Sequence, residues 1–223
     1  MQLTAQHAPV LSTPKSCNTM PCDRPPTQVK GRADKWAGRV SIIFSPPTAG
    51  AAGLLAVAAH INTPEAWAWS LADILLTVIL PLLFVVWLVQ TGRASDLDLC
   101  RRDQRKWPYR VMMLSSAVSI GLSLVFGGPP LLTILVGALA VQTLLLSLIT
   151  MAWKISLHTA AIAGTAAVAW YLAGAPALIL ALLTPVVAWA RVRLGRHDVP
   201  QTVAGALVGA ATFTATFALL PAL

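Results

Sequence analysis

Two histidines and an arginine lie at the ends of neighbouring apolar stretches, where their side chains could act together. His158 opens the stretch 157–173, and Arg191 and His197 follow the stretch 175–190. A helix of about 17 residues advances some 26 Å, so a chain that leaves along one helix and returns along the next brings these residues to a similar depth. An imidazole can attack phosphorus or protonate a leaving alcohol, and a guanidinium offers fixed donors to phosphate oxygens. The spacing therefore predicts a site for a phosphate ester that requires no metal and no cofactor.

The sequence around these positions resembles motifs of the type 2 phosphatidic acid phosphatase superfamily, the lipid phosphate phosphatases related to vanadium haloperoxidases. The last motif of that family is Ser-Arg, five residues, His, three residues, Asp. Here residues 190–201 read ARVRLGRHDVPQ, with Arg191 and His197 at the family spacing and Gln201 in place of the Asp. The middle motif, Pro-Ser-Gly-His, corresponds to ISLH at residues 155–158.

The first family motif, Lys, six residues, Arg-Pro, is degenerate in this chain. The segment DLCRRDQRKWPY resembles it as a basic run that ends at Pro108, and Arg102 and Arg105 are the cations that we assign to it. The order of the motifs also agrees with the family, and so does the spacing of two helices between successive motifs. The resemblance extends over about residues 66–220.

The resemblance implies a role for each matched residue. His197 would be the nucleophile and would form a phosphohistidine, while His158 would protonate the leaving alkoxide. The groups implied to hold the phosphoryl oxygens are Arg191, Ser156, Arg102 and Arg105.

Gln201 departs from the family pattern at the residue that should orient the nucleophile. A carboxylate there would orient His197 and stabilise its cation, whereas an amide oxygen can accept the imidazole N–H without contributing charge. Residues four apart on a helix face each other, so we expect Gln201 to contact the His197 ring and fix its tautomer. Asp198 is expected to face elsewhere and to favour the start of the last helix.

The composition places these residues in a membrane protein. Of the 223 residues, 57% are hydrophobic and 11% are charged, whereas a soluble domain carries about a quarter charged residues. This balance argues against a soluble enzyme and against a disordered chain. The three cysteines, Cys17, Cys22 and Cys100, are too few and too scattered for a disulfide framework.

Seven apolar segments approach the length of about 20 residues that crosses a bilayer. They are 41–61, which Pro46 and Pro47 interrupt, 66–90, 111–126, 131–153, 157–173, 175–190 and 201–220. We therefore predict an all-α polytopic membrane bundle of about seven transmembrane helices around a six-helix phosphatase-like core. Residues 1–35 are predicted to form a disordered tail, and residues 36–223 the membrane domain.

The distribution of charge predicts the orientation of this bundle. With seven crossings, all sixteen Lys and Arg fall in the tail and on the same side of the membrane, against eight Asp and Glu in the whole chain. The positive-inside rule makes that side cytoplasmic, which places the N-terminus and the site on the cytoplasmic face of the cell membrane. Because the positive charge lies beside membrane helices, we interpret it as topological and expect no nucleic-acid partner.

The remaining polar residues of interest have structural interpretations. Asp73 lies inside the second apolar segment near its outer end, where we expect solvation at the interface. His60 borders the opposite interface and has no expected catalytic role. Asp96, Asp98 and Asp103 alternate with arginines, which favours ion pairs within one loop over a metal site.

The leading hypothesis is a membrane lipid phosphate phosphatase that hydrolyses a phosphomonoester or pyrophosphate of an inner-leaflet lipid, of the phosphatidate or polyprenyl phosphate type. A lipid phosphotransferase is chemically close to it. The alternative is a catalytically degenerate membrane protein that binds anionic lipids, because juxtamembrane basic clusters attract anionic headgroups without catalysis. The pair His158 and His197 favours the enzyme, since simple charge attraction has no use for neutral imidazoles.

Overall fold

In this computed structural model, the described residues are 31–99 and 101–219, and they form helices joined by turns, with no strand among them. The α-helices are α1 (Arg32–Ile43), α2 (Pro46–Ile61), α3 (Pro64–Ile74), α4 (Leu80–Gln90), α5 (Lys106–Phe126), α6 (Pro130–Ala152), α7 (Leu157–Ala173), α8 (Leu183–Arg193) and α9 (Val199–Ala218). A π-helical turn, Leu75–Ile79, joins α3 to α4, and 3₁₀-helices, Arg102–Arg105 and Ala175–Leu182, precede α5 and α8. The predicted all-α fold is confirmed for these residues.

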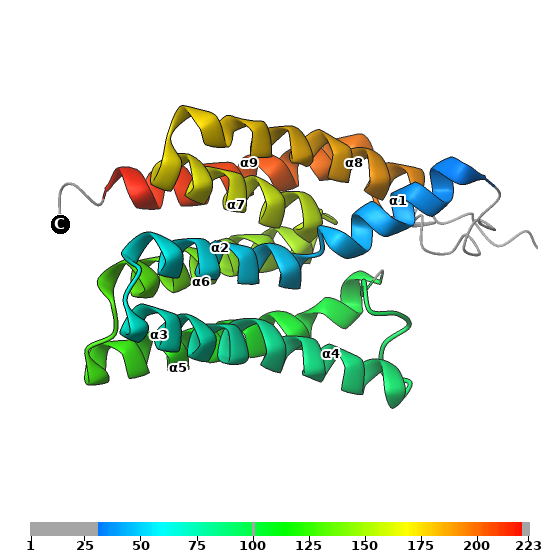
Figure 1. Ribbon diagram of the computed structural model, residues 1–223. Helices are drawn as coiled ribbons and strands as arrows, with labels where there is room; N and C mark the ends of the chain where they lie inside the picture. Colours follow the sequence, from blue (N-terminus) through cyan, green and yellow to red (C-terminus); the bar gives the residue numbers. More distant parts are fainter. Residues whose placement is uncertain (1–30, 100, 220–223) are drawn as a thin grey trace, which may run out of the picture.

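The helices lie side by side in layers (Figure 1). One outer layer contains α3, α4 and α5, the other contains α7, α8 and α9, and α2 and α6 lie between them. Helix α1 packs against α8 at one end of the bundle. Buried apolar side chains of α2, α6, α7 and α9 meet in one cluster, which includes Leu54, Val57, Leu135, Val168 and Phe213.

Several of the helices are long and apolar enough to cross a membrane. Within the described residues there are four, namely Pro64–Gln90, Asp103–Phe126, Pro130–Ala152 and Ala175–Arg193. The α1–α2 pair makes a fifth if its bend of 45° is counted within one span. The predicted bundle of apolar helices is therefore confirmed to contain four or five helical segments that could cross a membrane, while the predicted number of seven is not confirmed. Helix α7 has 17 residues and is a shorter apolar helix.

The first predicted segment is divided at its two prolines. Helix α1 ends at Ile43, and α2 begins at Pro46. Proline fits the first turn of a helix because the missing N–H has no acceptor there, so a second helix starts where the first one stops. Helix α1 begins at Arg32, within the segment predicted as a tail, and residues 1–30 of that segment lie outside the described residues.

Helices α7 and α9 pack with their backbones in contact. A Cβ atom at Gly205 would lie 2.3 Å from the carbonyl oxygen of Ser156, and one at Gly209 would lie 2.0 Å from that of Ala160. Only glycine permits this approach. At the same end, the N–H of Ser156 donates to the carbonyl oxygen of Gln201 at 3.2 Å. The start of α7 is thereby fixed to the start of α9, and α9 has small and polar residues where a lone membrane span would have leucines.

Asp73 is buried between helices. It is 3% exposed, and its carboxylate accepts a hydrogen bond from the hydroxyl of Ser119 on α5. The expectation that water at the interface would solvate Asp73 is wrong, because its carboxylate is buried against Ser119, one of four buried serines of α5. These are Ser115, Ser116, Ser119 and Ser123.

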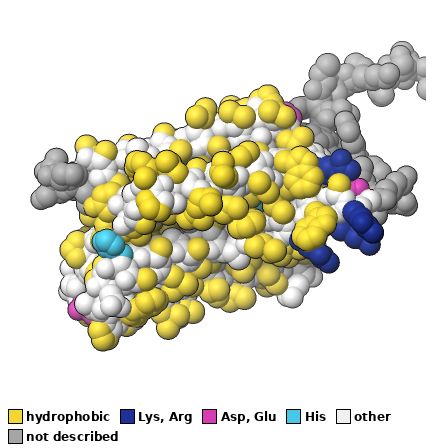
Figure 2. Space-filling view, turned by 45° about the horizontal axis from the view of Figure 1, so that its top comes forward, with side chains coloured by type: hydrophobic (Ala, Val, Ile, Leu, Met, Phe, Trp, Pro, Cys, Tyr) yellow, Lys and Arg dark blue, Asp and Glu magenta, His cyan; other side chains and the backbone are white. Residues whose placement is uncertain are grey.

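The outer surface separates into an apolar side wall and a basic end. Figure 2 shows hydrophobic side chains over the length of the bundle, with Lys and Arg gathered at one end. Three arginines at exposed positions lie over tryptophan rings, in the pairs Arg39–Trp36, Arg93–Trp87 and Arg110–Trp107. Tryptophan is enriched at the level of lipid headgroups, so these pairs are typical of a membrane–water boundary.

Candidate active site

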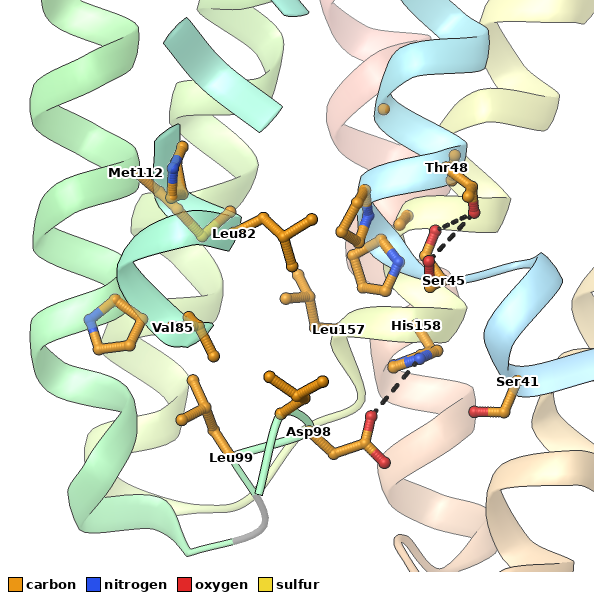
Figure 3. Close-up of a pocket in the computed structure, with 18 of the residues that line it drawn as sticks. Ser41, Ser45, Thr48, Leu82, Val85, Asp98, Leu99, Met112, Leu157 and His158 are labelled. Atoms are coloured by element: carbon orange, nitrogen blue, oxygen red, sulfur yellow. Dashed lines mark hydrogen bonds and ion pairs between the residues drawn. The ribbon is translucent and has the colours of Figure 1, made fainter. Parts of the chain in front are cut away.

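A cavity of about 1120 Å³ extends from the basic end into the bundle. Its inner part is lined by apolar side chains of several helices, including Leu82, Met112 and Leu135. Its outer part is lined by ionisable groups, including Asp98, His158 and Arg191. Figure 3 shows His158 and Asp98 facing each other across this space, below Leu82 and Met112. A molecule with an anionic head and an apolar body matches that distribution.

Arg191 connects the charged groups at the mouth of the cavity. It lies in the last turn of α8 and is 1% exposed. Its Nη1 donates to Ser41 Oγ at 2.7 Å, lies 3.2 Å from Asp98 Oδ2 and lies 3.5 Å from His158 Nε2. Its Nε is buried without a hydrogen-bond partner among the described residues. The guanidinium therefore keeps donor capacity for a further acceptor.

The turn after α8 brings His197 to the same place. The carbonyl oxygen of Arg191 accepts from the N–H of Arg196 at 3.0 Å and from that of His197 at 3.3 Å. This reversal requires Gly195, whose φ of +65° lies in the left-handed region. Arg191 thus contacts His197 through its backbone carbonyl and His158 through its side chain. The three residues that the sequence indicated therefore lie together.

His158 is positioned by the start of α7. Ser156 precedes the helix, and its Oγ accepts from the N–H of Thr159 at 3.4 Å, so that it caps the first turn. Ser156 is fully buried in this role. The ring of His158 is 8% exposed, and its Nε2 lies 3.9 Å from Asp98 Oδ1. The structure therefore brings His158 to the cavity and gives Ser156 a helix-capping contact.

His197 has the contact with Gln201 that its spacing indicated. Nδ1 of His197 lies 2.9 Å from Oε1 of Gln201, and both residues are buried. Burial lowers the pKa of His197 to about 2, and the nearby cations add to this effect. The imidazole is therefore neutral at physiological pH. The catalytic role of His197 stays a prediction.

Asp98 is a site residue that the sequence analysis missed. We expected it to pair within its own loop, but its carboxylate contacts Arg191 at 3.2 Å and Arg196 at 3.5 Å, far along the chain. Burial alone would raise the pKa of this carboxyl, but Arg191 and the other cations outweigh burial and hold the pKa below its ordinary value. Asp98 is therefore an anion beside the cations Arg191 and Arg196, which together are called the cationic cradle. Alternation of acids with arginines was the only signal for it in the sequence.

The local ion pairs expected in this loop are present in part. Asp103 pairs with Arg101 at 3.3 Å on the surface. Asp96, in contrast, pairs with Arg196 at 3.4 Å. The expectation of purely local pairs is wrong for Asp96 and Asp98, because the connection folds back over the end of α8.

Arg105 and Lys154 are buried beside the site and bind backbone carbonyls. Arg105 donates to the carbonyl oxygen of Leu99 at 2.8 Å and to that of Ile155 at 3.0 Å. Lys154 Nζ donates to the carbonyl oxygen of Arg196 at 2.7 Å. Burial and the neighbouring guanidinium groups lower the pKa of Lys154 to about 8. These cations hold the connections together while their charge faces the site.

The other residues singled out from the sequence either lie away from this site or belong to the part of the chain that the structure does not describe. Arg102 begins the 3₁₀-helix before α5, and its side chain is not among those described. Cys17, Cys22 and Cys100 lie outside the described residues. His60 lies in the last turn of α2. Among the described residues, no group of three or more His, Cys, Asp and Glu side chains could hold a metal ion.

Comparisons of this chain with protein-family models, with curated proteins and with solved structures find no match. The geometry of the site is therefore the basis for inferring what the protein does.

Proposed function

We propose that this protein is a membrane lipid phosphate phosphatase that hydrolyses a phosphomonoester or pyrophosphate of a lipid through a histidine nucleophile. The observation that carries the proposal is the convergence of Arg191, His158 and His197 at the mouth of a cavity with apolar walls. A guanidinium beside two imidazoles suits a phosphoryl group. The apolar walls suit the hydrocarbon chain attached to it.

The contacts of the Asp98 carboxylate support a phosphate site among these cations. This carboxylate bridges Arg191, Arg196 and His158 with its two oxygens, and a phosphoryl group offers the same kind of acceptor with more charge. Because Arg191 and both histidines are buried, the substrate reaches them when Asp98 moves aside.

The shape and lining of the cavity support a lipid as the substrate. The cavity continues from these charges past Leu82, Met112 and Leu139 towards the interior of the bundle. A lipid whose headgroup lies at the basic end would place its chain among these residues. Phosphatidate and polyprenyl phosphates or pyrophosphates have this combination of a terminal phosphate and a long apolar chain.

The reaction proceeds in two balanced steps. The lone pair on Nε2 of His197 forms a bond to phosphorus while the bond from phosphorus to the lipid oxygen breaks, and protonated His158 gives its proton to that oxygen. The charge of the bound phosphate favours this protonated form of His158. Water then attacks phosphorus, His158 takes a proton from the water, and the bond from phosphorus to Nε2 breaks. Inorganic phosphate leaves. It comes from the phosphomonoester or from the terminal phosphoryl group of the pyrophosphate.

The proposed topology has seven crossings with the basic end in the cytoplasm. The crossings are the longer apolar helices together with α7 and α9, since α7 and α9 run through the bundle beside the longer helices (Figure 1). The Arg–Trp pairs then lie at the cytoplasmic headgroup level of the cell membrane, and the substrates are lipids of the inner leaflet. Labelling of introduced cysteines at positions 30 and 128 from opposite sides of the membrane would support this topology.

The decisive experiment is phosphate release from a panel of lipid phosphates in detergent micelles. We expect the wild type to act on at least one lipid and His197→Ala to lower that rate by at least about a hundredfold. His60→Ala, at a histidine in α2, is the matched control and should retain the rate. Equal rates for wild type and His197→Ala on every hydrolysed lipid would overturn the proposal.

A second candidate function is the binding of anionic lipids without catalysis. The Arg–Trp pairs at the basic end favour it, because they hold cations at headgroup level. It predicts binding to vesicles with anionic lipid that is unaffected by His158→Ala and His197→Ala, together with no phosphate release from any lipid.

A further inference from the structure

The carboxylate that is absent at position 201 has a counterpart three residues earlier. Asp198 precedes α9, and its Oδ1 accepts from the backbone N–H of Gln201 at 2.9 Å. This is the helix-capping role expected from the sequence. Its second oxygen, Oδ2, accepts from the side-chain Nε2 of Gln201 at 3.0 Å. Asp198 is thereby connected to the histidine through Gln201, which contacts both side chains.

These contacts determine which way the Gln201 amide points. An ionised carboxylate can only accept hydrogen bonds, so the NH₂ end of the amide must face Asp198. The oxygen end then faces His197, at 2.9 Å from Nδ1. An amide oxygen also only accepts, so Nδ1 carries the proton. A neutral imidazole has one proton, and Nε2 is consequently left with its lone pair free.

We propose that Asp198 is a positioning residue that acts through Gln201 to hold His197 in the tautomer with the proton on Nδ1 and the lone pair on Nε2. The tautomer follows from the contacts alone, while its use in attack on phosphorus rests on the proposed function. Asp198, Gln201 and His197 thus form a relay in which an amide stands between carboxylate and imidazole.

The surroundings of the ring agree with this assignment. Because burial and nearby cations keep His197 neutral, it exists as one of two tautomers at physiological pH. The cations that face it come from other parts of the chain, namely Arg105, Lys154 and Arg191. Each of these offers only donors. A neutral imidazole with a free lone pair is compatible with these neighbours, since all three are cations.

The relay also bears on the charge that develops during attack. When Nε2 bonds to phosphorus, the ring becomes positively charged and still holds its proton on Nδ1. Gln201 Oε1 keeps accepting that proton, and the negative charge of Asp198 polarises the amide in the favourable direction. The helix cap thereby supplies the negative charge that a carboxylate at position 201 would supply directly.

The first test measures the tautomer without any substrate. Protein labelled with ¹⁵N-histidine in detergent micelles gives separate nitrogen signals for protonated and unprotonated ring nitrogens, and the signal lost in His197→Ala identifies residue 197. The wild type should show the proton on Nδ1. Asp198→Asn keeps the helix cap, because Asn and Asp cap equally well, but it turns an NH₂ group towards Gln201. The amide then reverses, and the proton of His197 should move to Nε2.

Asp198→Ser provides a second variant that is independent of amide reversal. Serine caps the helix as well as aspartate does but is too short to hold the Gln201 side chain, so a mixture of tautomers is expected. If Asp198→Asn does not give folded protein, this variant answers the same question. A wild-type level of the Nδ1–H tautomer in either folded variant would overturn the relay.

The second test separates the relay from the proposed enzyme activity. On any lipid that the wild type hydrolyses, Asp198→Asn should lower kcat at least about tenfold with little change in KM, and Asp198→Ser should lower it less. A tautomer change with no hydrolysis by the wild type would refute the phosphatase and leave the relay standing. Hydrolysis by the wild type with an unchanged tautomer in the variants would refute the relay and leave the phosphatase standing.

Discussion

Two carboxylates lie within this bundle, and their partners distinguish a packing contact from a site. Asp73, between α3 and α5, accepts from the neutral hydroxyl of Ser119. Asp98, in the connection after α4, contacts Arg191 and other cations beside a large cavity. A buried acid alone therefore does not indicate function. Asp98 differs because cations from separate parts of the chain converge on it beside the cavity.

The largest expected effect comes from the centre of the cationic group. Lysine at position 191 would keep the positive charge but would lose the planar fork of arginine, including the buried Nε that has no partner among the described residues. We expect Arg191→Lys to lower the rate of lipid phosphate hydrolysis by at least about a hundredfold. Arg193→Lys is the control, since Arg193 pairs with Asp34 at an exposed position. Similar rates for both variants would contradict the central role of Arg191.

A smaller loss is expected at Gln201. Leucine there would fill the space but would neither accept from Nδ1 of His197 nor donate to Asp198. We expect Gln201→Leu to lower the single-turnover rate of phosphohistidine formation about tenfold, which corresponds to about 1.4 kcal/mol of transition-state stabilisation. Thr202→Val, at the next position of α9, should retain the rate. If Gln201→Leu retained it as well, position 201 would have no part in the chemistry.

Removal of the Asp98 charge should strengthen anion binding. Because its carboxylate occupies the cationic cradle, we expect Asp98→Asn to bind inorganic phosphate about fivefold more tightly, equivalent to the ~1 kcal/mol of a partly exposed ion pair. Product inhibition of lipid hydrolysis would measure this. Asp103→Asn removes a surface charge of the same connection and should change nothing. Weaker phosphate binding in Asp98→Asn would show that the carboxylate assists anion binding.

The same ion pairs should give Asp98 a measurable dependence of stability on pH. The pKa of Asp98 in the folded protein lies below the ordinary value of 3.8, so its contribution is present above that value and is lost as pH falls through the lower one. The difference in thermal stability between wild type and Asp98→Asn should therefore shrink below pH 3.8. A difference that grew with acidity would show that the ion pairs do not stabilise the fold.

The smallest effect is expected at Asp73. Asparagine can still accept from Ser119, so Asp73→Asn should leave hydrolysis within about twofold and change the free energy of unfolding by about 1 kcal/mol or less. Chemical unfolding in micelles, followed alongside the activity assay, would measure both quantities. A hundredfold loss of activity would place Asp73 in the chemistry and remove the distinction between the two carboxylates.

The sequence was sufficient for those features that depend on local periodicity. Hydropathy predicted helices and a membrane bundle, and helical geometry predicted that residue 201 would face His197. The rise of neighbouring helices also brought His158 and Arg191 to the same depth. Each of these inferences needs only the spacing of residues along one helix or across one connection.

Features that depend on packing between distant segments could not be predicted. Asp98 meets Arg191 across 93 residues, and the partner of Asp73 lies 46 residues away on α5. No periodicity links such positions. The length and hydropathy of the individual helices also do not confirm the predicted number of seven spans, since α9 places Gly205 and Gly209 against the start of α7.

The backbone contact between α7 and α9 has a consequence for how the bilayer acts on this protein. A change in bilayer thickness tilts membrane helices, and loosely packed helices respond separately. Gly205 and Gly209 of α9 lie against backbone carbonyl groups at the start of α7. Backbone groups have no rotamers with which to adjust, so the two helices must tilt as one body. The geometry between His158 and Gln201, at the starts of these two helices, is therefore expected to change little when the surrounding helices tilt.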